Sequence, residues 1–123
     1  MSPVRVLVVD DQPPFQSAAR EVIESMESFE VVAVLDTGEA AVRAVETSRP
    51  DLVLLDVNLP GISGLEAARR ITSLPDPPAV LLLSTYDIAD YGDEVVECGA
   101  RGFLPKLAFG PESLAREWSR IGV

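Results

Sequence analysis

The chain has 123 residues, of which 47% are hydrophobic and 24% charged, a composition typical of a folded globular domain. Twenty acidic residues outnumber ten basic ones, and the formal net charge of −10 argues against direct binding of this segment to nucleic acid or to anionic lipid. The single cysteine, Cys98, excludes an internal disulfide. The absence of histidine excludes histidine-based triads, histidine metal ligands and a histidine phosphodonor. The lack of a membrane-length apolar run favours a cytoplasmic location.

Short apolar runs alternate along the chain with segments of helical periodicity. Residues 4–9 (VRVLVV) predict a first strand. Pro13 and Pro14 then open a helix, because proline suits the first helical turn. The predicted inner face of this helix consists of Phe15, Ala18, Ala19, Val22, Ile23 and Met26.

The second strand and second helix follow the same pattern. Residues 31–35 (VVAVL) predict a strand, and Thr37 is a candidate N-cap for a helix that runs to about Thr47. Arg49 and Pro50 end this helix, because the residue before a proline disfavours the helical conformation. The residues predicted to face inward are Ala41, Ala44 and Val45.

Residues 52–55 (LVLL) predict a third strand, which Asp56 closes. The turn residues Pro60 and Gly61 come next, and residues 63–66 (SGLE) match a capping box at the start of a third helix. This helix is predicted to bury Leu65, Ala68 and Ile71.

The last part of the chain predicts two more strands and two more helices. Residues 79–83 (AVLLL) form the fourth strand, a weaker helix lies within residues 87–98 and is interrupted by Gly92, and residues 102–105 (GFLP) form a short fifth strand. The final helix opens at Gly110. One side of that helix carries Leu114, Trp118 and Ile121.

Strands that alternate with helices predict an α/β fold with a parallel sheet covered by helices on both faces. The third and fourth strands are continuously apolar, as is the first apart from Arg5, and all three suit the centre of such a sheet. Pro105 lacks a backbone N–H and places the fifth strand at an edge. A right-handed, doubly wound (βα)5 fold of the flavodoxin type, with a five-stranded parallel sheet in the order 2-1-3-4-5, satisfies these constraints.

Polar residues stand where the predicted strands end: Asp10 and Asp11 after the first, Asp56 after the third, Ser84 after the fourth and Lys106 after the fifth. Neighbouring strands lie about 4.8 Å apart, so the acids must crowd together and would repel one another unless a cation lies among them. Mg²⁺, which prefers oxygen ligands, suits this position. Ser84 and Lys106 suit an oxyanion such as a phosphoryl group, and Asp56 is the candidate nucleophile that accepts it.

At these positions the chain resembles the CheY-like receiver domain of two-component response regulators, and it is similar to the NarL-like subgroup. The resemblance covers essentially the whole chain, residues 1–123. It rests on VLVVDD at 6–11, PDLVLLDVNLPGISGLEA at 50–67, VLLLSTYD at 80–87 and GARGFLPK at 99–106. It implies that a sensor histidine kinase phosphorylates Asp56. The output would be transcription control through a DNA-binding domain that this chain does not include, or protein contact by a stand-alone receiver.

The resemblance also implies a magnesium site. Asp11 would bind Mg²⁺ directly, Asp10 mainly through water, and Asn58 through its backbone carbonyl, with Asp56 as a further ligand.

The same resemblance implies a switch. Ser84 would form a hydrogen bond with the phosphoryl group and Lys106 would pair with it. Phe103 stands at the position of a switching aromatic that follows Ser84 inward, although it is at least as well explained as a core residue. The surface of the fourth helix, fifth strand and fifth helix would be remodelled for a partner. Independently of the resemblance, Gly92 and the weak periodicity of residues 87–98 favour the fourth helix as the mobile element.

Two positions depart from the family pattern. Leu107 follows Lys106 where the family often has a proline after a cis bond, which leaves the loop after the fifth strand open. Thr85 follows Ser84 where a small residue is usual, and we expect its β-branched side chain to crowd the water that hydrolyses the aspartyl phosphate.

Other functions stay open at this point. A Mg²⁺-dependent phosphohydrolase of the haloacid-dehalogenase type also uses a strand-end aspartate, but it needs a second acid where Asn58 stands. A binding module that no longer uses phosphate is the other alternative. Trp118 and Ile121, if partly exposed, could serve the face of a homodimer.

Overall fold

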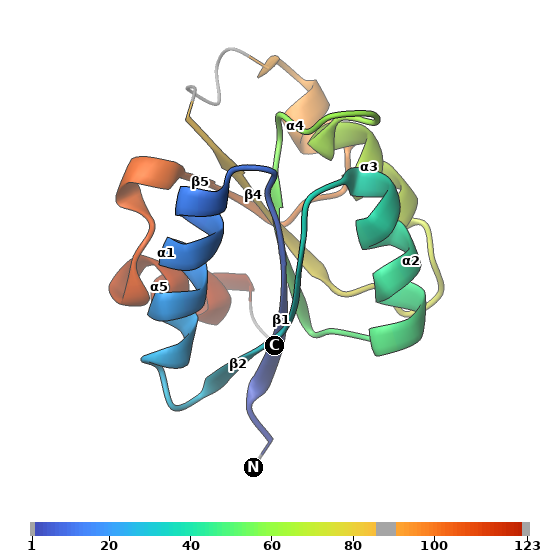
Figure 1. Cartoon of the computed structure of the whole chain (residues 1–123). Helices are drawn as coiled ribbons and strands as arrows, with labels where there is room; N and C mark the ends of the chain where they lie inside the picture. Colours follow the sequence, from blue (N-terminus) through green and yellow to red (C-terminus); the bar gives the residue numbers. More distant parts are fainter. Residues whose placement is uncertain (1, 86–90, 122–123) are drawn as a thin grey trace.

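The computed structural model describes residues 2–85 and 91–121 (Figure 1). Within these residues, five parallel strands form one sheet in the order β2-β1-β3-β4-β5, which confirms the predicted topology. The strands are β1 (Val4–Val9), β2 (Phe29–Leu35), β3 (Leu52–Asp56), β4 (Ala79–Ser84) and β5 (Gly102–Pro105). The proline-containing strand β5 lies at an edge, as its missing N–H predicts.

The helices lie on both faces of the sheet. They are α1 (Pro13–Glu24), α2 (Gly38–Ser48), α3 (Gly64–Thr72), α4 (Glu94–Glu97) and α5 (Pro111–Ile121). In Figure 1, α1 and α5 cover one face, and α2 and α3 cover the other. Each helix of the described residues is too short or too polar to cross a bilayer.

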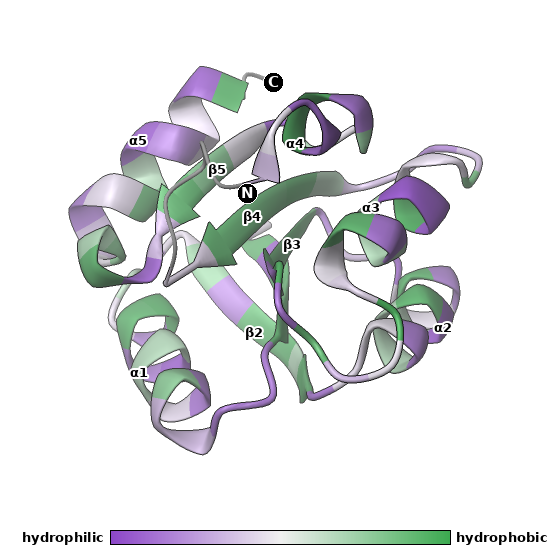
Figure 2. Ribbon diagram, turned by 90° about the horizontal axis from the view of Figure 1, so that it is seen from above, coloured by the Kyte–Doolittle hydropathy of each residue, from purple (hydrophilic) through white to green (hydrophobic). Residues whose placement is uncertain are grey.

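Two hydrophobic clusters, one on each face of the sheet, make up the core. The cluster under α1 and α5 includes Ile23 and Leu114, and the cluster under α2, α3 and α4 includes Val45 and Ile71. Figure 2 shows β4 coloured hydrophobic and the helices striped in both colours, as expected for amphipathic helices against a buried sheet.

Local signals set most helix starts. The hydroxyl of Thr37 accepts a hydrogen bond from the backbone N–H of Ala40 at 3.1 Å, so the predicted N-cap is confirmed. Ser63 caps α3 in the same way through the N–H of Glu66, also at 3.1 Å. The Glu66 carboxylate itself accepts a bond from Arg70 at 3.0 Å.

The structure corrects three details of the predicted elements. Ala18 is exposed, because Ala19 and Ile23 occupy the line of α1 that faces the sheet. Strand β2 begins at Phe29, two residues earlier than predicted, where it pairs with β1. Helix α4 covers only Glu94–Glu97 of the predicted segment, of which residues 87–90 lie outside the described residues.

The chain leaves β5 without a cis peptide bond, since all peptide bonds of the described residues are trans. Lys106–Ala108 form a single 3₁₀ turn, and the side chain of Leu107 is 100% exposed. Lys106 begins this turn, and its buried side chain reaches Asp10 at the sheet edge.

Gly64 allows α3 to start directly against the end of β3. Its N–H donates to the carbonyl of Val57 at 2.8 Å. A Cβ atom at this position would lie 2.0 Å from the backbone oxygen of Asp56 and 2.7 Å from Cα of Val57. Because these neighbours are backbone atoms, no side-chain rotation can relieve the clash.

We therefore predict that Gly64→Ala lowers the free energy of unfolding by about 2–3 kcal/mol, measured by urea denaturation. Gly110→Ala is the matched control, because a Cβ there would meet no heavy atom within 4 Å. The control should change stability by less than about 1 kcal/mol. Equal losses in the two variants would contradict the assigned close approach.

Candidate functional site

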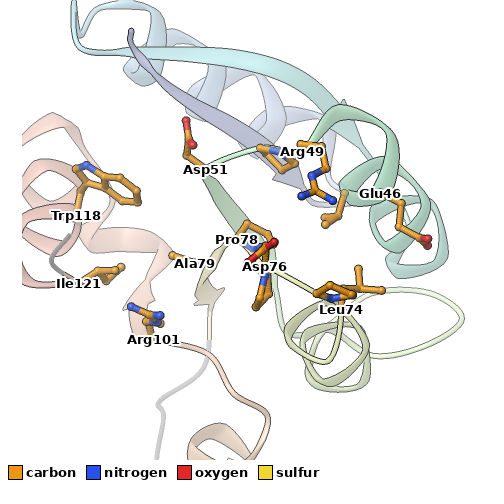
Figure 3. A pocket seen from close by; sticks show the side chains of 14 residues that line it. Glu46, Arg49, Asp51, Leu74, Asp76, Pro78, Ala79, Arg101, Trp118 and Ile121 are labelled. Atoms are coloured by element: carbon orange, nitrogen blue, oxygen red, sulfur yellow. The ribbon is translucent and has the colours of Figure 1, made fainter. Parts of the chain in front are cut away.

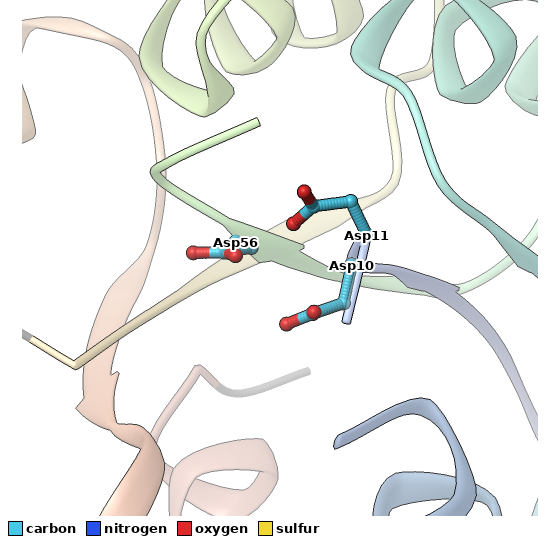
Figure 4. A group of neighbouring side chains, drawn as sticks. All are labelled: Asp10, Asp11 and Asp56. Atoms are coloured by element: carbon cyan, nitrogen blue, oxygen red, sulfur yellow. The ribbon is translucent and has the colours of Figure 1, made fainter. Parts of the chain in front are cut away.

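Three acidic side chains meet at the carboxyl ends of β1 and β3. Asp10, Asp11 and Asp56 each offer a carboxylate oxygen within 4.8 Å of the others. In Figure 4 the side chains of Asp10 and Asp11 leave the end of β1 on the side where Asp56 lies. Asp10 and Asp56 are buried and Asp11 is exposed. The crowding expected from the strand spacing is therefore present.

A cation of the protein itself lies between two of these acids. Nζ of Lys106 is 2.6 Å from Oδ2 of Asp10 and 3.1 Å from Oδ2 of Asp56, and the lysine side chain is only 7% exposed. The same ammonium lies 4.7 Å from the ring centroid of Phe15, close enough for a cation–π contact. One ammonium cannot balance three ionised carboxylates, so the cluster retains two negative charges when all three acids are ionised.

The pKa of Asp56 is raised above its ordinary value, mainly because the carboxyl is buried. The N–H of Asn58 and the ammonium of Lys106 act against this rise, and the Asp10 carboxylate adds to it. For Lys106, burial by itself lowers the pKa, but the carboxylates of Asp10 and Asp56 outweigh burial and raise it. Lys106 thus stays charged, and burial makes the ionised form of Asp56 less favourable than it is in water.

The oxygens of this cluster fit a hard divalent cation. Oδ1 of Asp10 accepts a hydrogen bond from the N–H of Gln12 at 2.8 Å. Oδ2 of Asp10 is buried and lies 2.6 Å from the ammonium of Lys106. A buried oxygen of this kind retains lone pairs for coordination, and the donor set is all oxygen, as Mg²⁺ requires.

Asn58 lies on the exposed rim beside the acids. Its backbone N–H donates to Oδ1 of Asp56 at 3.1 Å, and its side-chain amide donates to the hydroxyl of Tyr91 at 3.0 Å. The carbonyl of Asn58 as a metal ligand stays a prediction.

Ser84 is buried at the last position of β4, and its Oγ lies 2.7 Å from the hydroxyl of Tyr91. The ring of Tyr91 packs against Phe103 of β5, with 6.4 Å between the ring centroids. Phe103 is half-buried and belongs to the edge of the core on the α2 and α3 face. Its role as a switch stays a prediction.

A small cavity of about 220 Å³ lies among these groups, lined by Gln12, Asp56, Asn58, Thr85 and Lys106. The sequence-based prediction missed two residues of this site, Gln12 and Tyr91. Gln12 directly follows Asp10 and Asp11 in the sequence. Its place next to the strand-end acids is a signal that could have identified it. Tyr91 lies in a segment with weak periodicity, and only spatial proximity identifies it.

A larger cavity of about 620 Å³ lies at the opposite, amino end of the strands (Figure 3). Trp118 and Ile121 of α5 lie on one side of it, and Leu74 and Asp76 on the other. Charges of both signs are mixed along its wall. In a parallel sheet the chemistry belongs to the carboxyl ends of the strands, so we assign the functional site to the smaller cavity. Trp118 also contacts Phe29 edge-on, so it contributes to the core.

Comparison with known families gives one match, and it spans most of the chain. Residues 6–117 match the family described as the response regulator receiver domain.

Curated relatives agree with this match. The chain is 35% identical over 103 residues to the transcriptional regulatory protein DegU of Brevibacillus brevis, covering 84% of this chain and 44% of that protein. It is 33% identical over 105 residues to the response regulator UvrY of Escherichia coli K12, covering 85% of this chain and 48% of that protein. The chain thus spans about half the length of the curated relatives it matches.

Solved structures give the same result. The signal receiver domain of the response regulator NarL from Mycobacterium tuberculosis superimposes with a TM-score of 0.90 at 31% identity, covering 98% of both chains. A LuxR-family response regulator from Aurantimonas superimposes with a TM-score of 0.86 at 29% identity, covering 98% of this chain and 85% of that one. This chain belongs to the response regulator receiver domains, with NarL- and LuxR-family regulators among its relatives.

Proposed function

We propose that this receiver domain is a phosphorylation switch in which Asp56 accepts a phosphoryl group from a sensor histidine kinase in the presence of Mg²⁺. The observation that carries the proposal is the cluster of Asp10, Asp11 and Asp56, in which Asp56 lines a small cavity and lies 3.1 Å from Lys106. The output would be transcription control through a DNA-binding domain, or protein contact if the receiver acts alone.

The transfer step needs only one nucleophile from this chain. A carboxylate oxygen of Asp56 attacks the phosphorus of the kinase's phosphohistidine, the P–N bond breaks, and the imidazole nitrogen keeps the electron pair and takes up a proton. The product is an aspartyl phosphate. Lys106 pairs with the new phosphoryl oxygens, and the hydroxyl of Ser84 donates to one of them.

The metal would be held by Asp10, Asp11 and Asp56, with the carbonyl of Asn58 as a further ligand. When bound, Mg²⁺ neutralises negative charge on the phosphoryl oxygens as they approach the acids. The cluster suits this role because one lysine leaves two of its three carboxylate charges unbalanced.

The phosphoryl group then shifts a conformational equilibrium. It carries about 1.5–2 negative charges and three acceptor oxygens, and each charge-assisted hydrogen bond contributes about 1.5–3 kcal/mol. Such energies are enough to tip an element whose two states differ by a few kcal/mol. The element that we propose is the surface of α4, β5 and α5, with Ser84 and Phe103 as the moving side chains.

We predict that acetyl phosphate and Mg²⁺ add a single phosphoryl group to the chain, detected by intact-mass spectrometry. Asp56→Asn should abolish the addition because the nucleophile is gone. Addition that survives in Asp56→Asn contradicts the proposal, and no addition to the wild type favours a binding module without phosphate. Rapid, continuous turnover of p-nitrophenyl phosphate would instead favour a phosphohydrolase, whereas the proposal expects only slow hydrolysis of the chain's own phosphate.

The raised pKa of Asp56 predicts a change in stability with pH. Because burial raises this pKa in the folded state, the ionised carboxylate destabilises the fold at pH 7, and stability is gained as the pH falls through the folded pKa toward the ordinary value of 3.8. Asp56→Asn should therefore raise the Tm by about 2–4 °C at pH 7 in EDTA, and by less as the pH approaches 3.8.

Magnesium gives the complementary arm of this experiment. Millimolar Mg²⁺ should raise the Tm of the wild type more than that of Asp56→Asn, because the variant lacks one ligand. Asp36→Asn is the control, since it removes an acidic charge from an exposed residue. A lower Tm of Asp56→Asn at pH 7, or equal magnesium shifts in all three proteins, would overturn this account.

Thr85 is predicted to slow the loss of the phosphate. It lines the same small cavity as Asp56. We expect its branched side chain to crowd an attacking water there. Thr85→Ala should shorten the half-life of the phosphorylated form by roughly threefold or more, because a water then has room to reach the in-line position. Thr47→Ala, on the exposed side of α2, should leave the half-life unchanged. An unchanged half-life in Thr85→Ala refutes the idea.

A further inference from the structure

The side chain of Tyr91 contacts three residues of the site that belong to different parts of the chain: Ser84, Asn58 and Phe103. The hydroxyl of Tyr91 lies 2.7 Å from Oγ of Ser84 and accepts a hydrogen bond from the side-chain amide of Asn58 at 3.0 Å. The ring of the same residue packs at a tilted angle of 49° against Phe103. Tyr91 therefore joins the ends of β3 and β4 to strand β5.

The hydrogen bonds of this hydroxyl are mutually compatible. A tyrosine hydroxyl has one donor and two acceptor positions. The amide of Asn58 uses one acceptor position, which leaves the tyrosine able either to donate to Ser84 or to accept from it. Both arrangements tie the serine to Tyr91 in the unphosphorylated protein.

We propose that Tyr91 is a positioning residue whose hydroxyl competes with the phosphoryl group for Ser84. This inference rests on the proposed function, in which Ser84 turns to a phosphoryl oxygen on Asp56. To make that bond, the serine must weaken its 2.7 Å bond to Tyr91 or carry the tyrosine with it. The Tyr91 hydroxyl thus stabilises the unphosphorylated state and opposes phosphorylation.

The same side chain transmits the change to the surface. Tyr91 is half-buried three residues before the start of α4, and its ring contacts β5 through Phe103. Phe103 has no hydroxyl that could form a hydrogen bond with Ser84. Tyr91, which packs against Phe103, has such a hydroxyl. Loss of the bond between Ser84 and Tyr91 therefore loosens the packing of Tyr91 on β5 beside α4.

The test is the affinity of the chain for beryllofluoride with Mg²⁺, an analogue of the phosphoryl group, measured by fluorine NMR. Tyr91→Phe removes only the hydroxyl and should bind the analogue about fivefold more tightly, as expected for the loss of one competing hydrogen bond. In a Ser84→Ala background the same substitution should have no effect, because the serine that links the two events is gone. Tyr91→Leu removes the ring as well and separates the packing contribution from that of the hydroxyl.

The outcomes separate this inference from the proposed function. If the wild type does not bind the analogue, both fail. If the wild type binds it and Tyr91→Phe binds equally well or more weakly, or shows the same gain in the Ser84→Ala background, only the role of Tyr91 is overturned. A merely structural role would lower the Tm of Tyr91→Phe without changing the affinity.

A measurement on the unmutated protein provides a further check. The side-chain amide of Asn58 donates to Tyr91 in the unphosphorylated structure, so its NMR resonance should shift when the analogue binds. An unshifted resonance at saturation would contradict the proposed rearrangement.

Discussion

The buried contact of Lys106 with Asp10 and Asp56 is the interaction on which the site depends. Two carboxylates less than 5 Å apart repel strongly when they are shielded from water, and the ammonium at 2.6 and 3.1 Å offsets much of that repulsion. It leaves the third acid, Asp11, exposed and unbalanced at the rim. The ammonium of Lys106 thus holds the site together, and the negative charge that it leaves unbalanced suits a divalent cation.

The fold brings these groups together with few residues. Parallel pairing aligns the ends of β1, β3, β4 and β5 at one edge, so groups 50 residues apart in sequence, Asp56 and Lys106, come into contact. Gly64 lets α3 begin against the carbonyl of Asp56, which fixes the backbone behind the proposed phosphoacceptor. The strands that end at this edge are buried and apolar, and a close-packed interior deforms little. The core therefore does not take up small displacements of side chains at this edge.

The sequence was sufficient for the parts of this structure that depend on local pattern. Continuous apolar runs identified the central strands, Pro105 identified the edge strand, and Thr37 and Ser63 identified helix starts, because each of these signals acts within a few residues. The strand-end acids could be placed together because parallel topology leaves them no other arrangement. Ala18 was assigned to the wrong face because two adjacent alanines fit the same period, and only packing decides between them.

Other features depend on contacts that no local pattern encodes. The position of Lys106 between two acids follows from the single 3₁₀ turn after β5, and nothing in the residues Lys106–Ala108 specifies such a turn. The contacts of Tyr91 depend on the path of the chain after β4, where the periodicity is weak. Sequence therefore predicted the identities of the charged groups well and their pairing less well.

The charge balance of the cluster bears on the signal that the proposed phosphorylation of Asp56 would produce. An aspartyl phosphate brings nearly two negative charges but removes the one that the carboxylate already carried, so the net electrostatic change is about one charge. Lys106 already offsets part of the negative charge of this cluster, and a magnesium ion would offset more. The larger change is directional, because a planar carboxylate is replaced by a group with three acceptor oxygens that extends further into the cavity. The groups that would respond are hydrogen-bond donors near the carboxylate. Lys106 and Asn58 line the cavity together with Asp56, and Asn58 is linked through the hydroxyl of Tyr91 to Ser84.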